Sequence, residues 1–107
     1  MKKQKEYPAI NVINVMRGFP AKGLKYQVTP YRMQFPDGKV HVVRNIRRMT
    51  TQKVGNYIHY HYVVQSSEQR YFHIVLDTSV LTWKLVQEVD EELFFDQRPQ
   101  QTNGSNR

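Results

Sequence analysis

The sequence predicts a single, mainly β domain, built as a small antiparallel meander or a partly open barrel of five or six strands. Short runs rich in β-branched and aromatic residues alternate with turn residues along most of the 107-residue chain. Seven tyrosines, five phenylalanines and one tryptophan offer large apolar surfaces for a core. The chain has no cysteine, so packing and hydrogen bonds must hold the fold without disulfides.

Turn residues divide the chain into the expected strands. Pro30 lacks an N–H, so it favours an edge strand or a bend. The segment 35–39 contains Pro36, Asp37 and Gly38, which are typical of a tight hairpin turn. Polar loops are expected at 18–23, 50–56 and 66–69. The expected strands cover residues 9–16, 25–29 with 31–35 as a continuation, 40–49, 57–65, 70–76 and 81–86.

The folded domain is expected to cover residues 8–96, which is the size of small SH3-like or OB-like barrels. Val86, Val89 and Leu93 have helical spacing, so a short helical turn is expected at 89–94. Residues 1–7 and 97–107 are polar and are expected to be disordered. No stretch approaches the roughly 18 apolar residues of a membrane span, and a cytoplasmic location is expected.

The alternation of side chains along three consecutive strands predicts the two faces of the sheet. One face carries the expected core residues, which are Val40, Val42, Ile46, Ile58, Tyr60, Tyr62, Val64, Phe72, Ile74 and Leu76. The other face carries all four histidines, His41, His59, His61 and His73, beside Tyr57 and Tyr71. The histidines are expected to form either one cluster or a set of ordinary solvated side chains.

The charge of the chain is unevenly distributed. The net charge is +7, and residues 1–53 hold twelve basic and two acidic residues, whereas residues 54–107 hold four basic and seven acidic ones. A basic surface with aromatic and imidazole side chains suits contacts to phosphates and stacking on bases. The sequence therefore predicts a small nucleic-acid-binding module, although charges of this size also simply keep a domain soluble. The candidate contact residues are Lys39, His41, Arg44, Arg47, Arg48, Lys53, Tyr57, His59, His61, Tyr71 and His73.

Catalytic, metal and cofactor sites are not expected. The sequence contains no nucleophile elbow, no glycine-rich phosphate loop and no zinc-protease motif. His59 and His61 point the same way, but the strands that carry them contain no carboxylate as a further ligand. We therefore expect a protein that is not an enzyme and holds no metal or cofactor.

A protein-interaction or self-assembly module is the alternative function. Its partner, another protein or a second copy of the chain, would meet an exposed strand edge or the acidic segment 88–96. Within that segment, Leu93, Phe94 and Phe95 form an apolar triplet between acidic residues. The triplet could instead close the core of its own domain.

Overall fold

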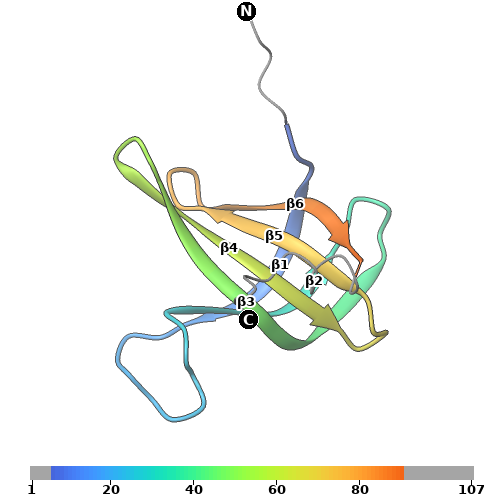
Figure 1. The fold of residues 1–107 in the computed structure, drawn as a ribbon, viewed down its shortest axis with the longest axis horizontal. Helices are drawn as coiled ribbons and strands as arrows, with labels where there is room; N and C mark the ends of the chain where they lie inside the picture. Colours follow the sequence, from blue (N-terminus) through green and yellow to red (C-terminus); the bar gives the residue numbers. More distant parts are fainter. Residues whose placement is uncertain (1–5, 91–107) are drawn as a thin grey trace, which may run out of the picture.

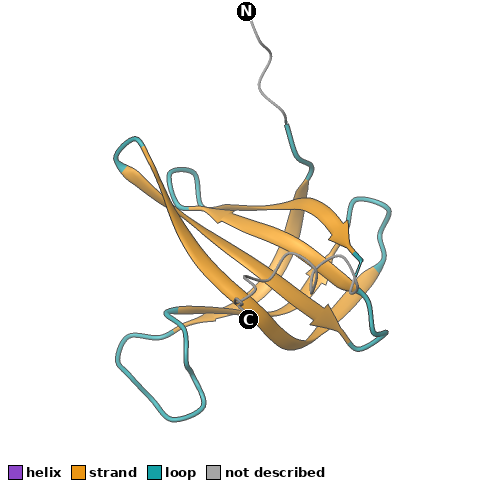
Figure 2. Cartoon of the chain, viewed as in Figure 1, coloured by secondary structure: helices purple, strands orange, loops and turns teal. Residues whose placement is uncertain are grey.

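The computed structural model describes residues 6–90, which form an all-β, closed antiparallel barrel of six strands (Figures 1 and 2). Each strand pairs with the next one in the chain, and β6 returns to pair with β1. The strands are β1 (Ala9–Met16), β2 (Val28–Gln34), β3 (Val40–Val54), β4 (Tyr57–Ser66), β5 (Tyr71–Asp77) and β6 (Thr82–Val89). The barrel confirms the predicted fold class.

The described part of the chain contains no helix, and hence none that could cross a membrane (Figure 2). The helical turn expected at 89–94 begins in strand β6, because Val89 pairs with Tyr71 of β5. Residues 91–94 lie outside the described residues, as do most of the expected tails at 1–7 and 97–107.

The core fills the barrel interior with side chains from all six strands. The predicted core positions of β4 and β5 are confirmed for Tyr62, Val64, Phe72, Ile74 and Leu76, whose exposures are all 5% or less. Tyr60 packs against this core from the side. Ile58 does not belong to it, because it is exposed near the far end of β4. The remaining buried members of the core are Ile10, Val28, Met33 and Trp83.

Strand β3 does not keep the regular alternation that the sequence predicted. Val40 and Val42 are exposed at 46% and 41%, whereas His41 is buried at 3%. Its ring packs between Phe35 and Phe72, with centroids 4.6 and 5.0 Å away. The assignment of Val40 and Val42 to the core and of His41 to the outer surface was therefore wrong.

Two β-bulges explain the rest of the β3 pattern. Val43 pairs with Ser66 and Asn45 with Gln65, so Arg44 is an extra residue. A second shift between Ile46 and Arg48 makes Arg47 an extra residue as well. Each bulge moves the inward-facing position by one residue. The side chains of β3 that reach the core are accordingly His41, Val43, Ile46 and Met49.

Strand β3 is also longer than predicted, and residues 50–54 do not belong to a loop. They pair with residues 57–61 of β4, and the end of this hairpin, beyond the last β4–β5 pair at His59, forms a two-stranded arm that extends past β5 (Figure 1). Gly55, with φ of +61°, supplies the left-handed conformation of the tight turn at its tip. Residues 50–58 are all exposed, which explains why polar residues such as Thr51 and Gln52 are tolerated in this extended arm.

Candidate functional site

A cleft opens where β2 and β3 separate. Only Arg32, Met33 and Gln34 of β2 pair with β3, at Val42, His41 and Val40. Beyond these pairs the two strands part and leave a hollow of about 300 Å³. The cleft is lined by Gly23, Lys25, Tyr26, Thr29, Pro30, Tyr31, Val43, Arg44, Asn45 and Ile46.

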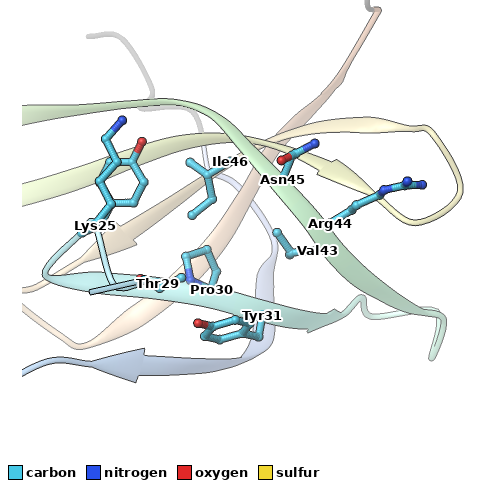
Figure 3. Close-up of a pocket in the computed structure, with 10 residues that line it drawn as sticks. Lys25, Thr29, Pro30, Tyr31, Val43, Arg44, Asn45 and Ile46 are labelled. Atoms are coloured by element: carbon cyan, nitrogen blue, oxygen red, sulfur yellow. The ribbon is translucent and has the colours of Figure 1, made fainter. Parts of the chain in front are cut away.

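Apolar side chains form the floor of the cleft, and polar side chains surround it. Figure 3 shows Pro30 of β2 and Ile46 of β3 facing each other across the opening, with Tyr31 on the β2 side and Arg44 extending from β3. Pro30 is fully buried and Ile46 is half-buried, whereas Tyr31 is 42% exposed. The Oγ1 atom of Thr29 is buried without a hydrogen-bond partner. The cleft therefore combines an apolar floor with accessible aromatic and cationic groups.

The loop between β1 and β2 positions the cationic side of the cleft. Arg17, just after β1, donates from Nη1 to the carbonyl of Leu24 at 2.7 Å, and its amide donates to the carbonyl of Gln27 at 2.9 Å. These bonds fix the backbone on both sides of Lys25 and Tyr26. The Lys25 ammonium then lies 5.5 Å from the centre of the Tyr26 ring, within the range of a cation–π contact.

The second surface of interest is the outer face of the barrel, formed by the solvent side of β3, β4 and β5. It carries Arg47, Arg48, His59, His61, Tyr71 and His73. The bulge at Arg47 turns its guanidinium toward Tyr71, where Nη1 donates to the hydroxyl at 3.3 Å. Arg44 of the cleft and Arg47 of the outer face are thus the extra residues of two successive bulges on one strand, which joins the two surfaces.

Two of the histidines form a hydrogen-bonded pair, His61 and His73, called here the histidine pair. Nδ1 of His61 lies 2.9 Å from Nε2 of His73, and Nε2 of His61 lies 2.8 Å from Oε1 of Gln52. An amide oxygen can only accept, so Nε2 of His61 donates to it. With both rings neutral, Nδ1 of His61 accepts from Nε2 of His73, so each ring carries its proton on Nε2.

Burial lowers the pKa of both members of the histidine pair. The pKa of His61 is lowered first by burial and then by His59, and that of His73 by burial, His61 and Arg48. Both imidazoles are therefore neutral near pH 7 and act as hydrogen-bonding and stacking groups. The positive charge of the outer face comes from its arginines and not from the histidine pair.

His59 has a different partner at the edge of the outer face. Its Nε2 lies 3.3 Å from Oδ1 of Asp77, the residue opposite it on β5. Hydrogen bonds from the Ser79 hydroxyl and amide to the same carboxylate lower the pKa of Asp77, so it remains ionised. His59 is thus oriented by a carboxylate that is itself held by a turn.

The structure brings together only part of the predicted contact set. Arg47, Arg48, His59, His61, Tyr71 and His73 share the outer face, and Arg44 lies at the neighbouring cleft. Four others lie elsewhere. His41 is in the core, Lys39 ends the β2–β3 turn, and Lys53 and Tyr57 lie near the tip of the β3–β4 arm. Leu93, Phe94 and Phe95 lie outside the described residues.

Sequence reasoning missed most of the cleft. The candidate residues did not include four that line it, Lys25, Tyr26, Thr29 and Tyr31. These four lie in sequence around Pro30, which was expected to favour an edge strand or a bend. Pro30 pairs with Asn14 of β1 at a register shift, in the part of β2 that does not pair with β3. A proline between aromatic and basic residues was thus the available signal for this opening.

No group of three or more histidine, aspartate and glutamate side chains within residues 6–90 is placed to hold a metal ion. Comparison of the chain with protein-family models, with curated proteins and with solved structures gives no match. The geometry of the cleft and of the outer face is therefore what bears on function.

Proposed function

We propose that this protein is a small non-enzymatic module that binds single-stranded nucleic acid. The observation that carries the proposal is the cleft between β2 and β3, whose lining includes two cations, Lys25 and Arg44, and two aromatic rings, Tyr26 and Tyr31. Single-stranded nucleic acid offers unstacked bases for aromatic side chains and a chain of phosphates for cations. A duplex keeps its bases stacked, so it could use the cations but not the tyrosines.

The outer face supports the same function by extending the basic surface along β3. Arg44, Arg47 and Arg48 follow one another within five residues of this strand, and the two bulges direct Arg44 to the cleft and Arg47 to the outer face. A strand that leaves the cleft would pass these arginines and the histidine pair. Arg binds phosphate with two parallel hydrogen bonds and also stacks on bases. We place this activity in the cytoplasm.

Fluorescence anisotropy with labelled 12-nucleotide DNA and RNA strands, and with a matching duplex, tests the proposal. We expect the single strands to bind more tightly than the duplex, and the affinity to fall as salt rises because each neutralised phosphate releases counterions. Tyr31→Ala should weaken binding about 5–150-fold, since stacking on one aromatic side chain is worth about 1–3 kcal/mol. Tyr57→Ala, which removes another exposed tyrosine at the arm tip, is the matched control.

The charge contribution has its own pair of variants. Arg44→Gln should reduce the slope of log affinity against log salt by about 0.7, the value for one phosphate contact on a single strand. Lys39→Gln removes the same charge at the β2–β3 turn and should change the slope less. Absence of binding at low salt, or equal losses in both members of each pair, would reject the proposed site.

A second candidate function, association with another protein, has support from an exposed apolar patch on β1, β2 and β3. Ile13 and Val40 are 63% and 46% exposed and line a shallow groove of about 240 Å³ beside Arg32. Exposed apolar patches commonly mark interaction sites. Light scattering over a range of concentrations, with Ile13→Asp as the variant, tests whether the chain self-associates through this patch. A parent protein that stays monomeric at all concentrations would remove the self-assembly form of this function.

A further inference from the structure

The outer face has an apolar centre that the proposed function does not use. Tyr71 and Val75 have the same alternation as His73, so they point outward, yet their exposures are only 4% and 5%. Neither belongs to the core cluster inside the barrel. Val63 and Val89 lie beside them, since they pair with His73 and Tyr71. Tyr71 and Val75 are thus outward-pointing apolar side chains that are nearly covered, and the half-buried Val63 and Val89 flank them on β4 and β6.

Basic side chains surround this apolar centre. Arg47 contacts the ring and hydroxyl of Tyr71, with the guanidinium carbon 5.7 Å from the ring centre. Arg48 pairs with Val63 and is close enough to His73 to lower its pKa. On the other side, Lys84 of β6 pairs with Val75. The surface is therefore apolar in its middle, with positive charge along β3 and at Lys84, and with the carboxylate of Asp77 at the far end of β5.

The chain itself contains a segment with the complementary pattern. Residues 90–96 are Asp90, Glu91, Glu92, Leu93, Phe94, Phe95 and Asp96, which is an apolar triplet between acidic residues. The segment follows directly on Val89, which pairs with Tyr71 at the edge of the apolar centre. Both the charges and the apolar positions of the segment therefore match those of the surface from which it starts.

The segment is also long enough to cross the surface. Neighbouring strands lie about 4.8 Å apart, so the path from β6 over β5 and β4 to β3 is about 14 Å. Seven extended residues span at most about 23–25 Å. Leu93 to Phe95 can thus reach Val75 and Val63, and the acidic residues can reach Arg47 and Arg48.

We propose that residues 90–96 dock on the outer face of their own barrel, with the apolar triplet on the centre formed by Tyr71 and Val75 and the carboxylates beside Arg47 and Arg48. A segment lying over these two side chains accounts for their low exposure of 4% and 5%, and its carboxylates would neutralise the neighbouring arginines. If the proposed function holds, the docked segment competes with the phosphates of a nucleic-acid strand for the arginines of β3.

Paramagnetic broadening tests the docking without any nucleic acid. Because the chain has no cysteine, Gln97→Cys creates a single attachment point for a nitroxide label. In the full-length protein we expect strong broadening of the amide signals of Tyr71 and Val75, and little at Ile13 on the apolar patch of β1–β3. Replacing Leu93, Phe94 and Phe95 by Ser in the labelled protein should remove the broadening.

Two results would overturn the docking proposal. One is an absence of broadening at Tyr71 and Val75. The other is broadening that appears only between molecules. It would be detected by mixing nitroxide-carrying protein without ¹⁵N with ¹⁵N-enriched protein without nitroxide, and it would mean that the occupant is a second copy of the chain. The contact within one chain is measured on protein that carries both the nitroxide and ¹⁵N, diluted with an excess of protein that carries neither.

Anisotropy then tests the competition separately. Glu91→Gln combined with Glu92→Gln should tighten single-strand binding about threefold or more over the parent at low salt. Asp37→Asn combined with Glu68→Gln changes the net charge equally on another surface and should tighten binding less. If broadening is observed but neither parent nor variant binds oligonucleotides, the docking stands and the proposed function fails. Equal effects of the two charge variants would refute the competition.

Discussion

Among the single Tyr→Phe substitutions, Tyr62→Phe should destabilise the barrel most. Tyr62 is 1% exposed, and its hydroxyl donates to the carbonyl of Val28 at 2.5 Å across the barrel. Burial raises the pKa of Tyr62, so the group is a neutral donor at all relevant pH values. Val28 begins β2, in the part of that strand that does not pair with β3. The bond therefore replaces part of the missing strand pairing.

The magnitude follows from the burial of both partners. Tyr62→Phe leaves a buried carbonyl without this donor, which costs about 1–3 kcal/mol and, in a domain of this size, lowers Tm by roughly 5–20 °C. Thermal denaturation followed by circular dichroism measures the change. Tyr60→Phe is the matched control, because the half-buried Tyr60 makes no hydroxyl hydrogen bond to the described residues and should change Tm by less than about 4 °C. Equal shifts in the two variants would refute the role of the Val28 bond.

Three further changes test the packing, the turns and the histidines. Ile74→Ala should cost about 2–5 kcal/mol because Ile74 is fully buried, whereas His59→Ala at the edge of the outer face should cost less than about 1 kcal/mol; urea denaturation that ranked them in reverse would invert the face assignment. Gly38→Ala should cost about 1 kcal/mol because its φ is +89°, and Gly18→Ala, which needs no positive φ, should be nearly neutral by the same assay. Because the pKa values of the histidine pair are lowered in the folded state, the folded protein binds fewer protons than the unfolded chain. The contribution of the pair to the free energy of unfolding is therefore fully present above about pH 6.5 and is lost as the pH falls below it. Replacing both histidines by Gln should make Tm fall less between pH 7 and 5.5, and an unchanged slope would contradict the assigned cause.

Regular alternation made strands β4 and β5 predictable. Their side chains keep period 2 without interruption, so Tyr62, Phe72 and Ile74 were correctly placed in the core and His59, His61 and His73 on the outer side. The pairing of these two strands is continuous over seven residue pairs. Where the backbone is this regular, the sequence pattern alone determines the two faces.

The same reasoning failed on β3 because its irregularities leave no mark in the hydrophobic pattern. Val40 and Val42 look like core residues, and only the observed pairing with Gln34 and Arg32 places them on the outer side of β2 and β3. The two bulges then shift the later positions, and a bulge depends on how two strands pair rather than on the residues of one strand. His41 therefore entered the core although its sequence neighbours suggested the reverse.

The cleft could not be derived from sequence for a related reason. It exists because β2 and β3 pair over only three residues, and that separation depends on the closure of the whole barrel. Pro30 indicated an irregularity in β2. Arg44 and Tyr31 line the same opening because of the bulge in β3, which the sequence does not reveal. The composition predicted a basic surface. The three-dimensional arrangement determines which basic side chains and which aromatic rings lie together.

The most direct test of the central claim is a map of the bound strand on the protein. Amide signals of ¹⁵N-labelled full-length protein should be followed during titration with an unlabelled 12-nucleotide single strand at low salt. We predict that the largest shifts occur in residues 25–31 and 43–48, on both sides of the cleft and along the arginines of β3. Shifts confined to Ile13, Val40 and their neighbours, or no shifts at saturating oligonucleotide, would contradict the assignment of this cleft as a nucleic-acid-binding site.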